Sequence, residues 1–533
     1  MEPIPLPAPF QGKNTRASEM VLANPQCRDL LNFNTTENGI ELRHGNPRYS
    51  KWNRQNTSST PIILTPYSES EFYLATFDDV ANNVDVYNVQ TGGIVYTIAQ
   101  SVVPEMQFLA FSRSLYFFIR SGTGAPGFYY NGAAWAPIGW TSASGAWVPF
   151  GGNSFKNRAY ILSSSIASGA IYFYSGISAT SGAVTLVNLN GIFSTWCYLV
   201  AIASTTVADN IASETFQCFI ANTGEVLFYS GSYPDAADWS LRGRANIGTP
   251  LSWNTTVAYN GDTLVMCDTG MISLRDVFLK GGRAAQDLAI SASISPTWTA
   301  LIKGIRSTYA QPESPIKFSG GTLNGYYIRA VWDSVNNRII IGFPVYLDDD
   351  GAVQIGFFNF VYDTERLAWT EHLTTAAAGV PVVDMAIYQQ KVFFVSYSTS
   401  IYIVWEKEGA VGFTDRDSTD VTELGYDFDV LSAPIAQSRA WVQVVAGMDI
   451  FVQSDMYDQT SWQLIRDFGV EETALQKIPG SAIEGDIAKP FLNAGIEGSF
   501  VQYRATGSTV DGKTVGVVLY GVNVWPEVGN SPR

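Results

Sequence analysis

The stretch from Cys218 to Trp239, CFIANTGEVLFYSGSYPDAADW, decides the expected fold. It contains an apolar strand, a turn of Asn, Thr and Gly, a second strand that ends in aromatic residues, and a tryptophan shortly afterwards. Short runs of aromatic and β-branched residues between turn residues are typical of strands joined by hairpins. The stretch therefore predicts two antiparallel strands of a larger sheet.

The same block recurs along the chain. Further blocks cover residues 114–135, 338–369 and 392–405, and incomplete ones cover 159–189 and 263–279. Their spacing is close to the roughly 40 to 50 residues of a propeller blade, and one blade cannot bury both of its faces alone. We therefore expect an all-β fold whose blades close into a β-propeller of six to eight blades. Stacked β-sandwiches are the alternative for the same blocks.

The composition divides the chain into four parts. We expect an extended N-terminal arm with the first strands at residues 1–59, the propeller at 60–412, an acidic linker at 413–430 and a smaller antiparallel β domain at 431–533. Only short windows, such as residues 472–477, could be helical.

The charge balance restricts the partners. The 533 residues carry a net charge of −16, which argues against an open DNA-binding face because affinity for phosphates comes from clustered Lys and Arg. An acidic channel, by contrast, would let a duplex slide without sticking. Residues 1–54 hold seven Lys and Arg against five Asp and Glu, so this segment is suited to docking on an acidic neighbour.

Targeting and redox signals are absent from the sequence. The start of the chain has no basic and apolar signal regions, and no window reaches the roughly 18 apolar residues of a membrane helix. We expect a protein made in the cytosol with no membrane-spanning segment. The four cysteines are too few and too widely spaced for a disulfide framework or a metal site, so we expect buried thiols.

Catalytic motifs are also lacking. His44 and His372 are the two histidines, neither lies in a recognisable constellation, and we expect His372 to be exposed or hydrogen-bonded at a strand end. Paired carboxylates could serve a glycoside hydrolase, but residues 232–239 and 454–462 fail the repeated S-x-D-x-G-x-T-W turn of sialidase propellers. Residues 348–351, DDDG, resemble half a calcium loop and are better explained as a hairpin turn. We expect no enzyme activity, no catalytic residue, no metal and no cofactor.

Two sets of phrases resemble a known family. The first comprises residues 10–16, FQGKNTR, residues 29–33, DLLNF, and residues 39–45, GIELRHG. These phrases resemble the opening of bacteriophage tail-tube or nozzle proteins, from which the chain departs at Cys27-Arg28 and at His44.

The second set follows in the order found in tail nozzle (hub) proteins of short-tailed phages. It comprises residues 261–274, 294–298, 332–344, 358–372 and 382–404. Together the two sets cover about residues 10 to 410, and the C-terminal domain matches in character alone.

The resemblance implies a structural virion protein that forms a ring, expected to be a hexamer, below the head-tail adaptor ring. Such a ring would extend the DNA channel, help to retain and eject the genome, and meet tail needle, plug or fibre proteins. The protein would be located in the virion after assembly in the host cytoplasm, and DNA would pass without sequence-specific binding. Lys13, Asn14, Arg16, Arg28 and Arg43 are the candidate assembly contacts. The alternative is a glycan-binding or glycan-cleaving propeller of a receptor-recognition apparatus.

Overall fold

The computed structural model of the chain describes thirty stretches of sequence. They are residues 4–16, 26–37, 39–44, 46, 48–53, 62–78, 81–100, 105–120, 126–144, 147–163, 165–208, 213–253, 255–281, 288–308, 328–348, 350–374, 382–397, 401–408, 415–416, 423–424, 427–432, 435–436, 443–454, 460–466, 471–472, 476–477, 487–488, 491–498, 500–509 and 517–526.

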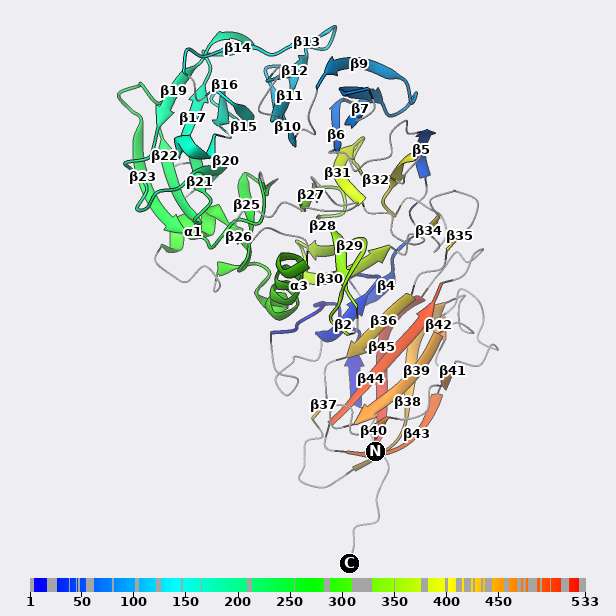
Figure 1. Cartoon of the computed structure of the whole chain (residues 1–533). Helices are drawn as coiled ribbons and strands as arrows, with labels where there is room; N and C mark the ends of the chain where they lie inside the picture. The colour runs from blue at the N-terminus through cyan, green and yellow to red at the C-terminus, as the bar shows by residue number, and fades with distance from the viewer. Residues whose placement is uncertain are drawn as a thin grey trace, which may run out of the picture.

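Within these stretches, seven antiparallel sheets form a closed ring, the upper body of Figure 1. The innermost strand of each sheet contacts that of the next, except that the fourth sheet contacts the second strand of the fifth, and the last sheet contacts the first. Six blades have four strands and one sheet has three. The expected all-β fold and the propeller are confirmed, and the blade number lies within the expected range.

The strands of the first four blades follow in chain order. They are β6 (Ile62–Ser68), β7 (Glu71–Asp78), β8 (Asn83–Asn88) and β9 (Ile94–Ala99); β10 (Glu105–Phe111), β11 (Ser114–Arg120), β12 (Gly127–Tyr130) and β13 (Trp135–Pro137); β15 (Pro149–Phe155), β16 (Arg158–Ser163), β17 (Ile171–Tyr174) and β19 (Thr185–Asn188); and β20 (Leu199–Ala208), β21 (Ser213–Ala221), β22 (Glu225–Ser230) and β23 (Ser240–Asn246). Two short strands, β14 (Gly139–Thr141) and β18 (Ser181–Ala183), pair in parallel beside them.

The remaining blades include one strand from the N-terminal segment. They are the three-stranded sheet β24 (Thr256–Tyr259), β25 (Asp262–Cys267) and β26 (Gly270–Ser273); blade six, β27 (Arg329–Asp333), β28 (Arg338–Leu347), β29 (Val353–Asp363) and β30 (Ala368–Thr374); and blade seven, β31 (Val382–Tyr388), β32 (Lys391–Tyr397), β33 (Ile401–Glu406) and β5 (Arg48–Asn53). Strand β5 pairs antiparallel with β33, so hydrogen bonds between early and late strands complete the ring.

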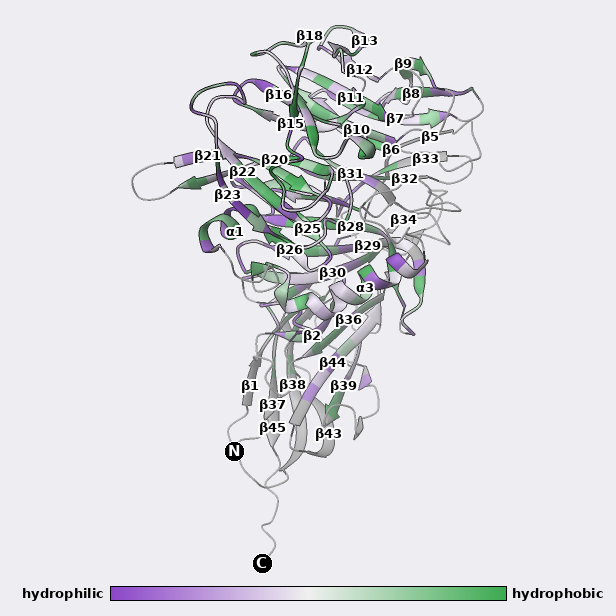
Figure 2. Cartoon of the chain, turned by 60° about the vertical axis from the view of Figure 1, so that its left-hand side comes forward, coloured by the Kyte–Doolittle hydropathy of each residue, from purple (hydrophilic) through white to green (hydrophobic). Residues whose placement is uncertain are grey.

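Apolar side chains between neighbouring sheets hold the ring together. Each of the clusters joins adjacent blades: one contains Phe77 and Phe117 from blades one and two, and another contains Tyr172 and Phe219 from blades three and four. Figure 2 shows hydrophobic residues, in green, within the strands of these sheets. Burial of apolar area on both faces of every blade is the main stabilising contribution that a propeller has.

Tight hairpins connect strands within the blades. Ser112-Arg113, Lys156-Asn157 and Gln389-Gln390 each place two successive residues at positive φ between directly paired strands. This is the conformation of a two-residue type I′ turn, whose twist matches that of the flanking strands. The hairpin expected at residues 348–351 is also present, since Gly351 has a φ of 77° between β28 and β29.

Helices are few among the described residues. They are α1 (Leu274–Lys280), the short 3-10 turns η2 (Ile166–Ser168) and η3 (Ala292–Ile294), and α3 (Ser295–Thr308). Helix α3 packs against β28 and β29 through Trp298, Leu301, Ile302 and Ile305. The expectation of a helix at residues 472–477 was wrong, because its described residues lie in β40 (Glu471–Glu472) and β41 (Gln476–Lys477). None of the helices described here combines the length and the hydropathy that a membrane span requires.

The lower body of Figure 1 contains two antiparallel sheets. Their remaining strands are β1 (Ile4–Pro7), β2 (Cys27–Leu31), β3 (Phe33–Thr35), β4 (Ile40–Leu42), β36 (Asp427–Ser432), β37 (Ile435–Ala436), β38 (Gln443–Ser454), β39 (Thr460–Arg466), β42 (Ile487–Ala488), β43 (Phe491–Gly498), β44 (Phe500–Ser508) and β45 (Val517–Pro526). A small hairpin, β34 (Asp415–Arg416) with β35 (Glu423–Leu424), lies in the segment expected as a linker. Phe33 from one sheet and Phe428 from the other meet edge to face, with ring centroids 5.6 Å apart.

The two bodies share one sheet. Its strand order is β27-β28-β29-β30-β2-β36-β44-β39-β40, so blade six continues through β2 into the C-terminal sheet. Strand β2 pairs in parallel with β30 at Leu31 and Glu371 and antiparallel with β36. The other described strands of residues 1–59 also pair within the chain: β1 and β4 with β45, β3 with β4, and β5 with blade seven.

Replacing Trp298 with alanine tests whether α3 is part of the propeller core. The Trp298 side chain is fully buried, stacks on Phe360 at 5.7 Å and donates its Nε1 hydrogen to the Cys267 carbonyl. We expect Trp298→Ala to lower the free energy of unfolding by about 3 to 5 kcal/mol in urea titrations. Trp196→Ala is the control, because Trp196 is 63% exposed and its loss should change stability by less than about 0.5 kcal/mol. Equal effects of the two substitutions would contradict the core position of α3.

Candidate functional site

A segment that we call the N-terminal strap joins the propeller to the C-terminal sheets. The strap consists of residues 12–16, 26–37 and 39–44, and it runs along strand β30. The Lys13 amide donates to the Trp369 carbonyl at 2.7 Å, and the Asn32 amide donates to the Glu371 carbonyl at 2.7 Å. The strap thereby satisfies backbone groups at the outer edge of blade six, an edge that would otherwise be open to unwanted pairing.

Lys13 anchors the start of the strap. Its side chain is buried, and its Nζ lies 2.8 Å from Glu371 Oε1 and 3.3 Å from Asp29 Oδ1. Burial lowers the pKa of Lys13, but the two carboxylates outweigh burial and the pKa is raised overall. The ammonium therefore stays charged and links β30 to β2.

Arg43 anchors the other end. Its side chain is fully buried, with Nε donating to Asn32 Oδ1 at 2.9 Å, Nη1 to the His44 carbonyl at 3.0 Å and Nη2 to the Leu373 carbonyl at 3.1 Å. Asn32 has a φ of 62°, a left-handed conformation that asparagine tolerates better than most residues. The fork geometry of one guanidinium thus fixes a turn of the strap against β30.

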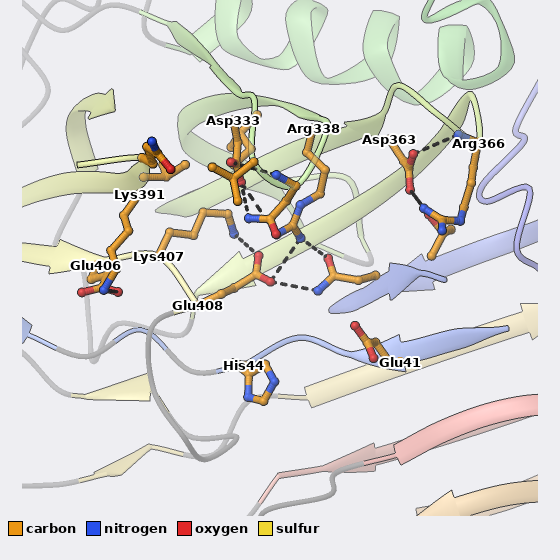
Figure 3. Close-up of a pocket in the computed structure, with 17 residues that line it drawn as sticks. Glu41, His44, Asp333, Arg338, Asp363, Arg366, Lys391, Glu406, Lys407 and Glu408 are labelled. Atoms are coloured by element: carbon orange, nitrogen blue, oxygen red, sulfur yellow. Dashed lines mark hydrogen bonds and ion pairs between the residues drawn. The ribbon is translucent and has the colours of Figure 1, made fainter. Parts of the chain in front are cut away.

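Beside the strap lies a cavity of about 400 Å³, which we call the charged pocket (Figure 3). Arg338 Nη1 lies 3.2 Å from Glu408 Oε2, and Lys407 Nζ lies 3.0 Å from Glu408 Oε1. Asp363 and Arg366 form a second pair at 2.7 Å. The pocket is lined by Asn34, Thr35, Glu41, His44, Asp333, Val335, Asn336, Arg338, Ile340, Asp363, Arg366, Gln390, Lys391, Val392, Glu406, Lys407 and Glu408.

His372 lies behind the pocket on β30 and is fully buried. Its Nε2 is 3.2 Å from the Phe33 carbonyl of the strap, and its Nδ1 is 3.0 Å from Lys407 Nζ. A neutral ring with the hydrogen on Nε2 satisfies both contacts, since Nε2 then donates to the carbonyl and Nδ1 accepts from the ammonium. Of the two expectations for His372, hydrogen bonding is confirmed and exposure was wrong.

The ionisation of this cluster follows from burial and neighbours. Burial lowers the pKa of His372 to about 3, and the charge of Lys407 acts in the same direction. Burial also lowers the pKa of Lys407 to about 8, even though Glu408 opposes the change. Burial raises the pKa of Glu408, but Arg338 and Lys407 hold it well below its usual range. Each charge in the cluster is therefore held by an opposite charge, which suits a joint between parts of the chain.

The described residues offer no obvious metal site. No three His, Cys, Asp or Glu side chains among them are grouped so that they could hold a metal ion. The four cysteines, Cys27, Cys197, Cys218 and Cys267, are buried and unpaired, which confirms the expected buried thiols.

The structure brings the five residues predicted as assembly contacts into one region, the strap. Lys13 and Arg43 are buried as described, Asn14 Nδ2 donates to Gln26 Oε1 at 2.9 Å, and Arg28 Nη1 donates to the Thr15 carbonyl at 3.1 Å. Arg16 is exposed at the end of the first described part of the strap. A role of these residues between subunits stays a prediction.

Sequence reasoning missed the partners of the strap. Arg338, Lys407 and Glu408 gave no signal as a motif, because they are far from the strap in sequence and meet it only through the ring closure. The one available signal was the charged run Glu406-Lys407-Glu408 at the end of an apolar strand, which predicts a charged strand end but not its partners.

The glycine at position 12 allows the strap to approach β30. Gly12 has a φ of +73°, and a Cβ at this position would lie 2.6 Å from the Trp369 carbonyl oxygen. We expect Gly12→Ala to lower the free energy of unfolding by about 1 to 3 kcal/mol, because the left-handed conformation and the contact both become unfavourable. Gly93→Ala is the control, since the nearest atom to its added Cβ would be Thr91 Oγ1 at 3.6 Å. If both variants unfold at the wild-type urea concentration, the close approach of the strap is contradicted.

The buried imidazole predicts a pH dependence of stability. In the unfolded chain His372 binds a proton near pH 6.5, whereas in the folded chain it stays neutral down to about pH 3. Between these values the unfolded state holds more protons, so stability falls as the pH falls, by about 1.4 kcal/mol per pH unit from this residue.

Urea titrations at about pH 6.5 and about pH 5 measure this slope. Burial raises the pKa of some carboxyl groups, such as Glu41 and Asp384, and their contribution cancels when the protein is compared with a variant of His372 alone. His372→Gln keeps a donor and an acceptor but no titration, so we expect the difference in unfolding free energy between the two pH values to shrink by up to about 2 kcal/mol. An unchanged difference in the variant would show that His372 is not buried in its neutral form.

No family model matches the chain, and no curated protein matches it. Among solved structures the chain is similar to the WD40 domain of Pan2 from Neurospora crassa, with 8% sequence identity and a TM-score of 0.34. That similarity covers 69% of this chain and 97% of the WD40 domain.

Proposed function

We propose that this chain is a structural virion protein that forms a ring in the tail nozzle of a short-tailed phage. The ring would lie below the head-tail adaptor, extend the DNA channel, and help to retain and eject the genome. The observation that carries the proposal is the sheet shared by the two bodies, in which β2 of the strap connects β30 of blade six to β36 of the C-terminal sheet.

A shared sheet suits a protein that bears a mechanical load. Force applied to the C-terminal sheets would reach the propeller through the pairing of β2 with β30 and through the buried pair Lys13-Glu371. A closed propeller leaves only short, protected sheet edges, so no long edge can peel first.

The phrases that carry the family resemblance also meet in space. Residues 12–16 and 29–33 belong to the strap. Strand β30 and strands β31 to β33, which contain the described residues of 368–372 and 382–404, are those on which the strap lies or with which it shares the charged pocket. Part of the resemblance therefore falls on one joint of the fold, which supports a common construction with nozzle proteins.

The charge of the chain fits a passage for DNA. A net charge of −16 gives a ring of such subunits a large surplus of carboxylates, which would repel phosphates and prevent the duplex from adhering. We propose a homo-oligomer, expected to be a hexamer, with the adaptor ring on one side and a needle, plug or fibre protein on the other.

The second candidate, a glycan-binding or glycan-cleaving propeller, is favoured by one observation. Innermost strands of all seven sheets line an axial cavity of about 810 Å³, which contains the aromatic residues Phe108, Tyr259 and Trp332. Aromatic faces beside polar groups suit a sugar. The two carboxylates of the cavity are already engaged, Asp384 by Arg329 at 3.1 Å and by the Leu64 amide, and Asp262 by Thr205 and the Arg275 amide.

The proposal can be tested by electron microscopy and native mass measurement. Both use the purified full chain, alone and with a head-tail adaptor protein. We expect closed rings with an axial passage, held by interfaces of more than about 1,000 Å² per contact. A panel of oligosaccharide substrates is assayed on the same preparation.

A chain that stays monomeric with the adaptor and that cleaves a glycan would overturn the ring and support the second candidate. In that case Asp384→Asn should abolish turnover, because Asp384 is a carboxylate of the axial cavity. Ring formation without turnover would support the nozzle.

A further inference from the structure

A second cavity lies along helix α3, on the side where the strap ends. It has a volume of about 550 Å³ and is lined by Arg16, Asp268, Thr269, Ser295, Thr299, Ile302, Lys303 and Arg306. We call it the cationic cleft. Three of its lining residues are cationic and one is acidic, in a chain whose net charge is −16.

The helix supplies one continuous wall. Ser295, Thr299 and Lys303 follow each other at intervals of four residues, and Arg306 lies three residues further on, so these side chains share one face of α3. Two hydroxyl groups and two cations therefore face the same cleft. All of these groups can donate hydrogen bonds to oxygen.

The two cations of the helix have no ionic partner among the residues that the structure describes. Neither Lys303 nor Arg306 forms an ion pair within the described part of the chain, and Arg306 Nη2 is buried without a hydrogen-bond acceptor. A buried guanidinium hydrogen without an acceptor is costly. The helix dipole explains a cation in the last turn, such as Arg306, but contributes only about 0.3 to 1 kcal/mol.

Arg16 lines the cleft near the start of the helix. The Thr15 and Arg16 amides both donate to the Ser293 carbonyl, at 2.7 and 2.9 Å, and Thr297 Oγ1 donates to Thr15 Oγ1 at 3.2 Å. These bonds fix Arg16 near the start of α3, where a positive charge is unfavourable. The single acid of the cleft, Asp268, accepts from the Thr249 amide at 3.0 Å and so is partly engaged.

We infer that the cationic cleft is a binding site for a phosphate compound with more than one charged group. Arg and Lys with neighbouring hydroxyl donors are the side chains that recognise phosphate oxygens. The cleft is larger than one phosphate ion and has cations along its length, so Lys303 and Arg306 would hold one phosphate group and Arg16 a second. The site does not depend on the proposed ring.

Isothermal titration calorimetry of the full chain tests the site with inorganic phosphate, tripolyphosphate and citrate as probes. We expect tripolyphosphate to bind at least about tenfold more tightly than phosphate, because a second charged group is held. We expect citrate, which carries carboxylates, to bind more weakly than tripolyphosphate.

Three substitutions divide the site. Lys303→Gln and Arg306→Gln should each weaken both phosphate probes by about tenfold, whereas Arg16→Gln should weaken tripolyphosphate and leave inorganic phosphate unchanged. Lys280→Gln is the matched control, since Lys280 is a lysine on helix α1 that pairs with Asp276 at 2.8 Å, outside the cleft. Lys303 is exposed, so its variant should unfold at the wild-type urea concentration and report binding alone.

Several results would overturn the inference. The first is that neither phosphate probe binds, and the second is that Lys280→Gln and Lys303→Gln lose affinity equally. The third is that citrate binds more tightly than tripolyphosphate. The fourth is that a duplex DNA oligonucleotide binds whereas no small phosphate does. Failure of ring formation would leave the site unaffected, and so the two proposals fail separately.

Discussion

The hydrogen bonds between the strap and strand β30 are the interaction on which the rest of the structure depends. Strand β30 is the outer strand of a blade, and an outer strand has one row of unpaired backbone groups. The strap pairs with that row through Lys13, Leu31 and Asn32, and on its other side β2 pairs with β36. The outer edge of blade six is thereby covered, and the same pairing connects the propeller to the C-terminal sheets.

The buried charges beside the strap make this connection specific. Desolvation of an ion pair often costs as much free energy as the pairing returns, so a pair such as Arg338-Glu408 contributes little net stability. Its value lies in the cost of a wrong arrangement, since a shifted strap would remove Asn34 from Glu408 and Arg338, and Arg43 from the Leu373 carbonyl. The charges therefore favour one register of strap and blade, whereas the apolar clusters between blades would tolerate several.

The sequence was informative wherever the signal was local. Aromatic and β-branched runs between turn residues predicted the all-β fold, the hairpin at Gly351 and the blades, because each feature depends on residues close together in the chain. Helix α3 was not predicted, since SPTWTALIKGIRST has a proline, a glycine and three threonines, and Trp298 with Leu301 and Ile305 forms the helix through packing. The charged pocket was not predicted either. His372, Lys407 and Asn34 meet through ring closure, and no spacing in the sequence encodes that contact.

The strap also connects the two sites that the fold offers. Its first part, Lys13 to Arg16, contacts β30 on one side and η3 with α3 on the other. Lys13 is neutralised by carboxylates of the chain, and Arg16, three residues later, lines the cationic cleft together with Lys303 and Arg306. A ligand that neutralised Arg16 would add a contact to the same segment that joins the propeller to the C-terminal sheets. Because a ligand stabilises the state that binds it, phosphate in the cleft would hold the strap in place and stiffen the joint.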